Sequence, residues 1–141
     1  MGRDHQGAAV VRSTHRAFNE RDRDAFLGCL AQDVVWHVVG QHPLAGTYEG
    51  RDSLWEDYME PMWASPARVE DREVLEHGDH VVAVGDVVHN FGEGELRFET
   101  VEVLRLEGER VVERWEFTAR QAELDRRLTQ GCAAADGPDL D

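Results

Sequence analysis

The 141-residue sequence contains no lysine and no isoleucine, so all 15 of its basic side chains are arginines. Against 29 acidic residues they leave a formal net charge of −14. An acidic surface repels polyphosphates and anionic lipid headgroups, which excludes general nucleic-acid binding and docking on acidic membranes. The two missing residue types are typical of a GC-rich, bacterial genome.

Cysteines and long apolar runs are also scarce. Cys29 and Cys132 provide neither a disulfide framework nor the spacing of a metal site, and nothing near His77 and His80 completes a ligand set. No apolar run approaches the roughly 18 residues of a membrane-spanning helix. The polar residues 1–5 lack the apolar core of a signal peptide. We therefore expect a cytoplasmic protein with no metal ion and no membrane anchor.

The apolar residues that are present, 41% of the chain, suffice for the core of one domain. We place this domain at residues 1–130 and expect a flexible acidic tail at residues 131–141. Apolar spacing predicts helices over 8–20 and 52–63, with a short helix capped by Asp22 or Asp24 between them. Strands are expected over 34–39, 67–77, 80–91, 95–106 and 110–117, and an ordered loop over 40–50. A capping box at 118–121 begins a last helix. Pro61 is expected to kink or end its helix, and the charged 67–77 strand to lie at a sheet edge.

Helices segregated onto one face of a curved antiparallel sheet make an α+β fold. A strongly bent sheet that is closed by helices leaves a conical cavity, which is a natural site for a small molecule.

The element order and four stretches of the chain resemble the nuclear transport factor 2-like superfamily and, within it, the SnoaL-like relatives of polyketide cyclases. These stretches are Asp33–His37, His42–Gly50, Val101–Arg114 and Trp115–Phe117. The resemblance implies a cystatin-like α+β barrel, in which a cone-shaped antiparallel sheet wraps around three to four helices, and usually a dimer. It also implies variable chemistry, because members include ketosteroid isomerases, polyketide cyclases, epoxide hydrolases, dehydratases and non-catalytic modules.

The sequence departs from the resembled enzymes at two positions. Val38 stands where ketosteroid isomerases carry their general-base aspartate, and Arg120 stands where many SnoaL-like relatives carry an aspartate. Glu102 matches the oxyanion-stabilising aspartate of the isomerases by its spacing from the last hairpin turn. The resemblance therefore implies a role for Glu102 alone among these positions.

Strand alternation also singles out Glu102. One face of the 95–106 strand is apolar except for Thr100 and Glu102. A two-residue type II′ turn at Gly108 would place Glu102 opposite Trp115 and Thr100 opposite Phe117, whereas a longer turn would shift these pairs. Against an indole, the carboxyl is expected to have a raised pKa and to act as an oxyanion donor or a general acid or base. The alternative is an ordinary ion pair with a nearby arginine, or exposure at the cavity mouth.

His89 and Asp86 interrupt the 80–91 strand on opposite faces, and both faces are apolar. The one that faces the cavity is a candidate proton partner for Glu102. The alternative is a strand-end histidine and a hydrogen-bonded surface aspartate.

The remaining candidates are ligand contacts rather than catalytic groups. They are Trp36 and Val38 on the first strand, His42 and Tyr48 in the following loop, Tyr58 on the third helix, Thr100, and Trp115 as a wall. His42 is equally explained as a solvated turn residue. His15 interrupts the apolar stripe of the first helix, where a hydrogen-bonded histidine at the edge of the core is the favoured interpretation.

Two functions fit this sequence. The first is a cofactor-independent isomerase, cyclase or dehydratase acting by acid–base chemistry on a hydrophobic carbonyl compound. The second is a non-catalytic module that binds a small ligand or dimerises. A homodimer suits both, because the second face of the hairpin carries Val101, Val103 and Val112 among Glu99, Arg105 and Arg114.

Overall fold

The computed structural model describes residues 6–92 and 94–136, and their side chains up to residue 130. The helical elements are α1 (Gln6–Glu20), α2 (Arg23–Gly28), α3 (Arg51–Leu54), η2 (Trp55–Met59), α4 (Glu60–Trp63) and α5 (Gln121–Asp136). The strands are β1 (Leu30–Val38), β2 (Gly46–Glu49), β3 (Ala67–His77), β4 (His80–Asn90), β5 (Glu95–Glu107) and β6 (Arg110–Thr118). The chain thus has the expected α+β composition.

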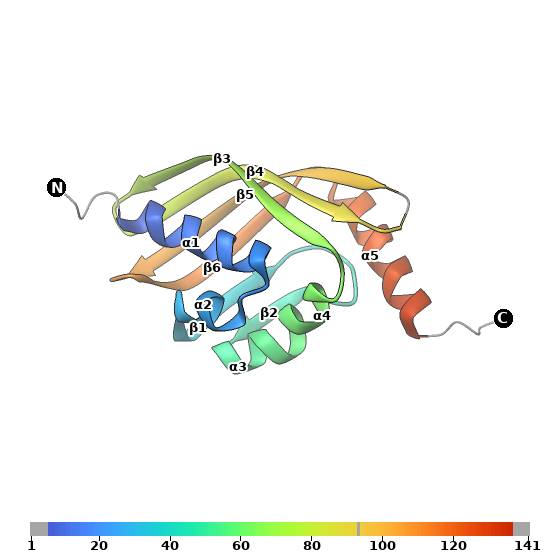
Figure 1. Ribbon diagram of the computed structural model, residues 1–141, viewed down its shortest axis with the longest axis horizontal. Helices are drawn as coiled ribbons and strands as arrows, with labels where there is room; N and C mark the ends of the chain where they lie inside the picture. Colours follow the sequence, from blue (N-terminus) through green and yellow to red (C-terminus); the bar gives the residue numbers. More distant parts are fainter. Residues whose placement is uncertain (1–5, 93, 137–141) are drawn as a thin grey trace.

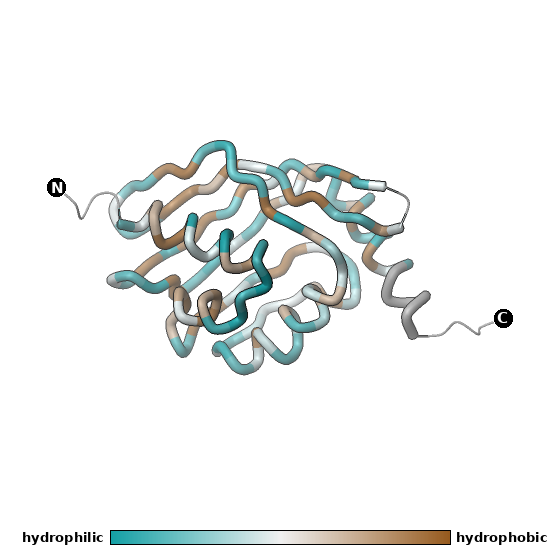
Figure 2. The backbone as a smooth tube through the Cα atoms, in the orientation of Figure 1, coloured by the Kyte–Doolittle hydropathy of each residue, from teal (hydrophilic) through white to brown (hydrophobic). Residues whose placement is uncertain are grey.

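The strands form one curved, unclosed sheet in the order β2-β1-β6-β5-β4-β3. Helices α1 to α4 lie along its concave side, and α5 stands at one end (Figure 1). The sheet is mixed rather than wholly antiparallel, because β1 and β6 run parallel. Three successive hairpins connect β3 to β6 and bring β6 back beside β1. Each hairpin reverses the chain, so the direction of β6 is set by that of β3. The hydrophilic strand β3 occupies the expected edge (Figure 2).

Local sequence signals explain most helix boundaries. The carboxylate of Asp22 accepts a hydrogen bond from the backbone N–H of Ala25 and caps α2. The predicted 52–63 helix is continuous from α3 to α4, with the π-helical turn η2 just before Pro61. Proline lacks an N–H and crowds the preceding turn, which a wider π turn accommodates. The helix ends at Trp63, two residues after Pro61.

Several predicted boundaries are wrong, and the first strand, for example, begins at Leu30 rather than at residue 34. The expected 40–50 loop contains the short strand β2, which pairs with the end of β1. The expected capping box fails because Thr118 is still part of β6 and pairs with Thr100. A left-handed residue, Arg120 at φ 59°, turns the chain into α5 instead. This helix continues to Asp136, within the expected tail, whereas residues 137–141 lie outside the described residues.

A β-bulge in β6 sets the register of the last hairpin. The two-residue turn at Gly108, which has φ 62°, is formed as expected. Leu106 then pairs with Val111, but Arg105 pairs with Glu113, so Val112 is the extra residue. Beyond the bulge every partner is displaced by one, which reverses the two faces of β6. Arg114 and Glu116 therefore lie on the same face as Glu102, and the predicted pairing of Glu102 with Trp115 is wrong.

A second irregularity, between Asp71 and Glu73, interrupts the pairing of β3 with β4. At this point Asp71 lies opposite Gly85, and the two backbones approach closely. A Cβ atom at Gly85 would lie 2.2 Å from the backbone oxygen of Glu70. Glycine is thus required for the backbone geometry that holds Asp71 on the concave side.

We expect Gly85→Ala to lower the free energy of unfolding by about 2–4 kcal/mol, because backbone atoms must move to admit the methyl group. Urea denaturation measures this change. Gly28→Ala is the matched control, since no atom lies within 4 Å of a Cβ added there. A Gly85→Ala protein as stable as the Gly28→Ala protein would show that the close approach does not constrain β3.

Candidate functional site

A cavity of about 80 Å³ lies between the concave face of the sheet and the helices. Its apolar wall comes from Phe18, Phe26, Trp36, Met59 and Met62, among others. Most of these side chains also belong to the main hydrophobic core. The cavity is therefore an extension of the core, into which a few polar side chains project.

Glu102 is the centre of a buried charged cluster on one side of this cavity. Its carboxylate accepts a hydrogen bond from His15 Nε2 at 2.6 Å and another from Arg114 Nε at 2.7 Å. His15 Nδ1 lies 2.8 Å from the carboxylate of Asp71. The four residues come from α1, β3, β5 and β6, so the cluster ties the first helix to three strands. Negative and positive side chains alternate along the cluster: His15 lies between Asp71 and Glu102, and Arg114 lies beside Glu102.

His15 and Arg114, the two hydrogen-bond donors to Glu102, keep its carboxyl ionised. Burial alone would raise the pKa of this carboxyl, but the charges of Arg114 and His15 outweigh burial and lower it to about 2. Burial likewise opposes the charged form of His15, yet Glu102 and Asp71 raise the pKa of its imidazole to about 10. The expectation of a protonated Glu102 with a raised pKa is therefore wrong, because the reversed β6 face supplies Arg114.

Glu116 is the second carboxyl of the cavity, and it is held differently. It lies directly across from Glu102 in the sheet, and Arg114 Nη2 is 3.0 Å from its Oε1. Burial raises the pKa of Glu116, and the negative charge of Glu102 adds to this, against the opposing charge of Arg114. Two neighbouring carboxyls thus have pKa values shifted in opposite directions, and Glu116 is the one that holds a proton more readily.

Two hydrogen-bond donors face the same region. The guanidinium of Arg114 lies 4.5 Å from the centre of the Trp36 ring. Tyr58 is 8% exposed, and burial raises the pKa of its hydroxyl, which therefore stays protonated. Nothing in the described part of the chain accepts a hydrogen bond from this hydroxyl. Arg114 and Tyr58 can both donate to an oxygen atom bound in the cavity.

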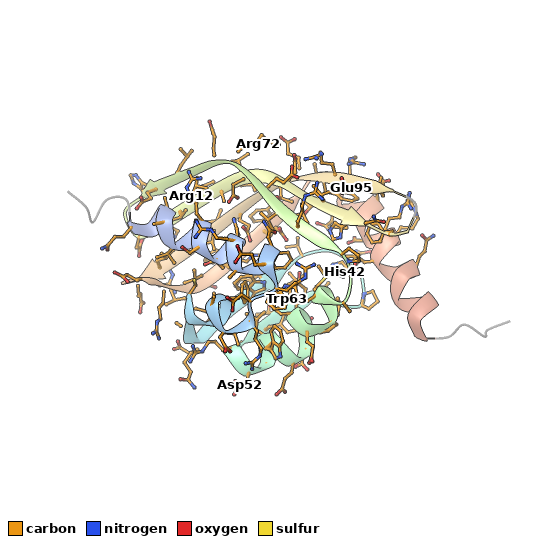
Figure 3. The ribbon with its side chains drawn as sticks, viewed as in Figure 1. Arg12, His42, Asp52, Trp63, Arg72 and Glu95 are labelled. Carbon is orange, nitrogen blue, oxygen red and sulfur yellow. The ribbon has the colours of Figure 1, made fainter. Side chains whose placement is uncertain are left out.

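Seven of the predicted residues line the cavity: Trp36, Val38, His42, Tyr58, His89, Thr100 and Glu102. His42 lies beside the start of α5 (Figure 3), where the backbone N–H of Gln41 donates to Asp125. Burial lowers the pKa of His42, which disfavours the alternative of a solvated turn residue.

Three predicted residues do not line it. Asp86 lies on the outer face of β4, where Arg72 and Arg97 bind its carboxylate. Arg72 projects on the side of the sheet away from the helices (Figure 3). Trp115 is turned outward by the β6 bulge and stacks on His37 at 5.4 Å. Tyr48 packs on Tyr58 and donates its hydroxyl hydrogen bond to the backbone oxygen of Leu44.

Sequence reasoning missed Arg114, Glu116 and Asp71, and treated His15 as structural. His15 carried a usable signal, because it interrupts an apolar helical stripe that has to face the sheet. Arg114 and Glu116 carried the opposite signal, since regular alternation places them outside. Among the described residues, no group of histidine, cysteine and carboxylate side chains could hold a metal ion. None of the described helices is long and apolar enough to span a membrane.

The family model of the SnoaL-like domain matches residues 11–131. Among solved structures, an NTF2-like protein from Burkholderia pseudomallei is 25% identical, with a TM-score of 0.79 over 88% of this chain and 98% of that one. The structure of TerC co-crystallised with polyporic acid is 18% identical, with a TM-score of 0.77 over 89% of this chain and 98% of that one. A putative polyketide cyclase from Sinorhizobium meliloti is 16% identical, with a TM-score of 0.64 over 77% and 94% of the two chains. No curated protein sequence matches the chain.

The raised pKa of His15 predicts a specific loss of stability at alkaline pH. Its folded-state pKa of about 10 exceeds the usual 6.5, so its contribution is complete below pH 6.5 and disappears as the pH rises through 10. We expect the free energy of unfolding to fall by about 2–4 kcal/mol more in the native protein than in His15→Gln over this interval. Urea denaturation at a series of pH values measures the difference.

His80→Gln is the control for this experiment, because the side chain of His80 is 45% exposed and pairs with Asp79, outside the cluster. It should retain the full alkaline loss. Equal pH dependence in the His15→Gln protein would contradict a charged His15 in the cluster.

Proposed function

The chain belongs to the SnoaL-like domain family, and we propose that it is a cofactor-independent enzyme of the isomerase, cyclase or dehydratase type. Its substrate is a hydrophobic compound with a carbonyl group, which binds in the cavity between sheet and helices. The observation that carries this proposal is the carboxyl pair Glu102 and Glu116, which share Arg114 and have oppositely shifted pKa values. Such pairs divide the roles of acid–base catalysis between a fixed charge and a proton carrier.

In this reaction Glu116 is the proton carrier. Its ionised carboxylate takes a proton from the carbon next to the substrate carbonyl. The electron pair of that C–H bond forms a new C=C bond, and the π pair of the carbonyl moves onto the carbonyl oxygen. Arg114 and Tyr58 donate hydrogen bonds to the resulting oxyanion. Protonated Glu116 then returns the proton to a different carbon, which completes an isomerisation, or to a leaving hydroxyl group, which completes a dehydration.

Glu102 and His15 have a positioning role in this proposal. Glu102 accepts from Arg114 Nε and so fixes the guanidinium plane beside the cavity. His15, held by Asp71, keeps Glu102 ionised. The negative charge of Glu102 in turn favours the protonated form of Glu116. Asp71, His15, Glu102 and Arg114 therefore together influence the proton affinity of Glu116.

Two observations support an organic, apolar substrate. The apolar part of the cavity wall consists of aromatic, methionine and aliphatic side chains, which bind apolar surface. Of the structural neighbours, one was co-crystallised with polyporic acid and another is described as a putative polyketide cyclase.

The second candidate function is a non-catalytic module that binds the same class of ligand. It is favoured by the internal pairing of the charged cluster, in which Arg114 already contacts both Glu102 and Glu116. Under this function, ligand binds without any exchange of its protons.

Proton exchange on a model ketone separates the two functions. The probe is 2-indanone in D2O, whose exchange of the protons next to the carbonyl is followed by NMR. We expect the native protein to accelerate the exchange, and Glu116→Gln to reduce the acceleration about 100-fold or more while 2-indanone still binds. Because the carboxylate is the active form, the rate should rise with pH through the raised pKa of Glu116.

Glu73→Gln is the matched control, since Glu73 is an exposed carboxylate on the outer face of β3. It should exchange 2-indanone at the native rate. Binding of 2-indanone without accelerated exchange would establish the non-catalytic function.

We also propose a homodimer that forms through the outer face of the sheet. The β6 bulge removes Arg114 from this face and adds aromatic rings to it. Its central rows contain Leu75, Val82, Val84, Val101, Val103, Trp115 and Phe117. Leu75 and Phe117 are 56% and 53% exposed, which is unusual for large apolar side chains in a monomer.

Light scattering tests the dimer. We expect a mass of twice the 16.0 kDa chain for the native protein and of one chain for Phe117→Glu, because a carboxylate at the centre of an apolar interface is left unpaired. A native monomer would refute the interface, and so would a Phe117→Glu dimer.

A further inference from the structure

One of the polar cavity side chains outside the charged cluster is almost fully buried and has an unpaired nitrogen. His89 is 2% exposed, and its Nδ1 atom has no hydrogen-bond partner in the described part of the protein. Its ring stacks on Phe91 at 5.2 Å and meets the edge of Phe98 at 5.9 Å. A buried nitrogen without a partner costs folding free energy, so its presence calls for an explanation.

His89 lies well away from Glu102. On β4 it is opposite Leu96 of β5, whereas Glu102 is opposite Ala83. Six residues separate the two positions on each strand, or roughly 20 Å along an extended backbone. Both side chains nevertheless line the same cavity. The cavity therefore has two polar ends of different character, a charged one at Glu102 and an uncharged one at His89.

The surroundings of His89 select an uncharged, ring-shaped ligand group. Phe98, Leu124 and Leu128 form a separate small apolar cluster here, against which Phe91 and Leu96 pack. No hydrogen bond or ion pair joins a charged side chain of the described residues to the imidazole, and burial lowers its pKa to about 4. The neutral ring has one N–H donor and one bare nitrogen, and a hydroxyl group can pair with either of them.

We propose that the His89 end of the cavity is a second subsite, which binds a ring-borne hydroxyl group of the ligand through the neutral imidazole. The inference rests on the proposed function in so far as both concern one cavity, and it adds to the substrate a hydroxylated ring at the end remote from the reacting carbonyl. Helix α5 contributes Leu124 and Leu128 to this subsite, so the last helix takes part in recognition.

Phenol is the probe for this subsite, with toluene as the ring of similar shape that lacks the hydroxyl group. Their dissociation constants are measured by NMR titration, with shifts at Phe98 and Leu124 reporting the position. We expect His89→Phe to weaken phenol binding about tenfold and to leave toluene binding unchanged or tighter. Because the variant removes the unpaired nitrogen, we also expect its Tm to rise by about 3 °C.

His89→Leu serves as a second, smaller variant in case the phenylalanine ring fits poorly, and the same loss of phenol binding is expected. Glu73→Gln, the exposed control on the outer face of β3, should bind phenol as the native protein does. The inference is overturned by phenol binding that is unchanged in both His89 variants, or by phenol shifts confined to the Glu102 end. If phenol binding depends on His89 but the protein does not accelerate 2-indanone exchange, the proposed enzyme is refuted and this subsite is still supported.

Discussion

The buried carboxylate of Glu102, held between His15 and Arg114, is the interaction on which the rest of the site depends. A lone carboxylate at this depth would be protonated, and a lone guanidinium or imidazolium would be strongly disfavoured there. Together they remain charged, at separations of 2.6 and 2.7 Å. The charges of Glu102 and His15 are each kept by the opposite charges beside them, so the cluster is complete only when α1 is docked on the sheet.

Two departures from regular β structure bring these groups together. The bulge at Val112 turns Arg114 and Glu116 toward the cavity, and the irregularity beside Gly85 keeps Asp71 on the same side. Bulges often occur next to functional sites, where they redirect side chains. The same bulge turns Trp115 and Phe117 outward, which creates the apolar outer face. One extra residue therefore determines both the charged site and the proposed dimer surface.

The sequence predicts this structure well where the strand pairing is regular and poorly where it is irregular. Regular patterns were sufficient for the apolar stripe of α1, a cap at either Asp22 or Asp24, the Gly108 turn, the edge position of β3 and the inward direction of Glu102. They failed where the pairing is irregular, because an extra residue in a strand leaves no mark in composition or periodicity. Arg114 was consequently placed on the outer face, and Glu102 was assigned an indole neighbour instead of a guanidinium. The sequence did not decide which face of β4 lines the cavity, because valines occupy both faces. The structure shows that it is the face that carries His89.

Two adjacent carboxyls in one cavity, Glu102 and Glu116, have pKa values shifted in opposite directions, and a carbon NMR titration of the glutamate side chains follows both. Assignment uses Glu102→Gln and Glu116→Gln, each of which removes one resonance. We expect Glu102 to stay ionised down to about pH 2, whereas Glu116 takes up its proton above the usual glutamate pKa of 4.5. A Glu102 resonance that titrates above pH 4.5, or a Glu116 resonance that titrates below it, would contradict the account.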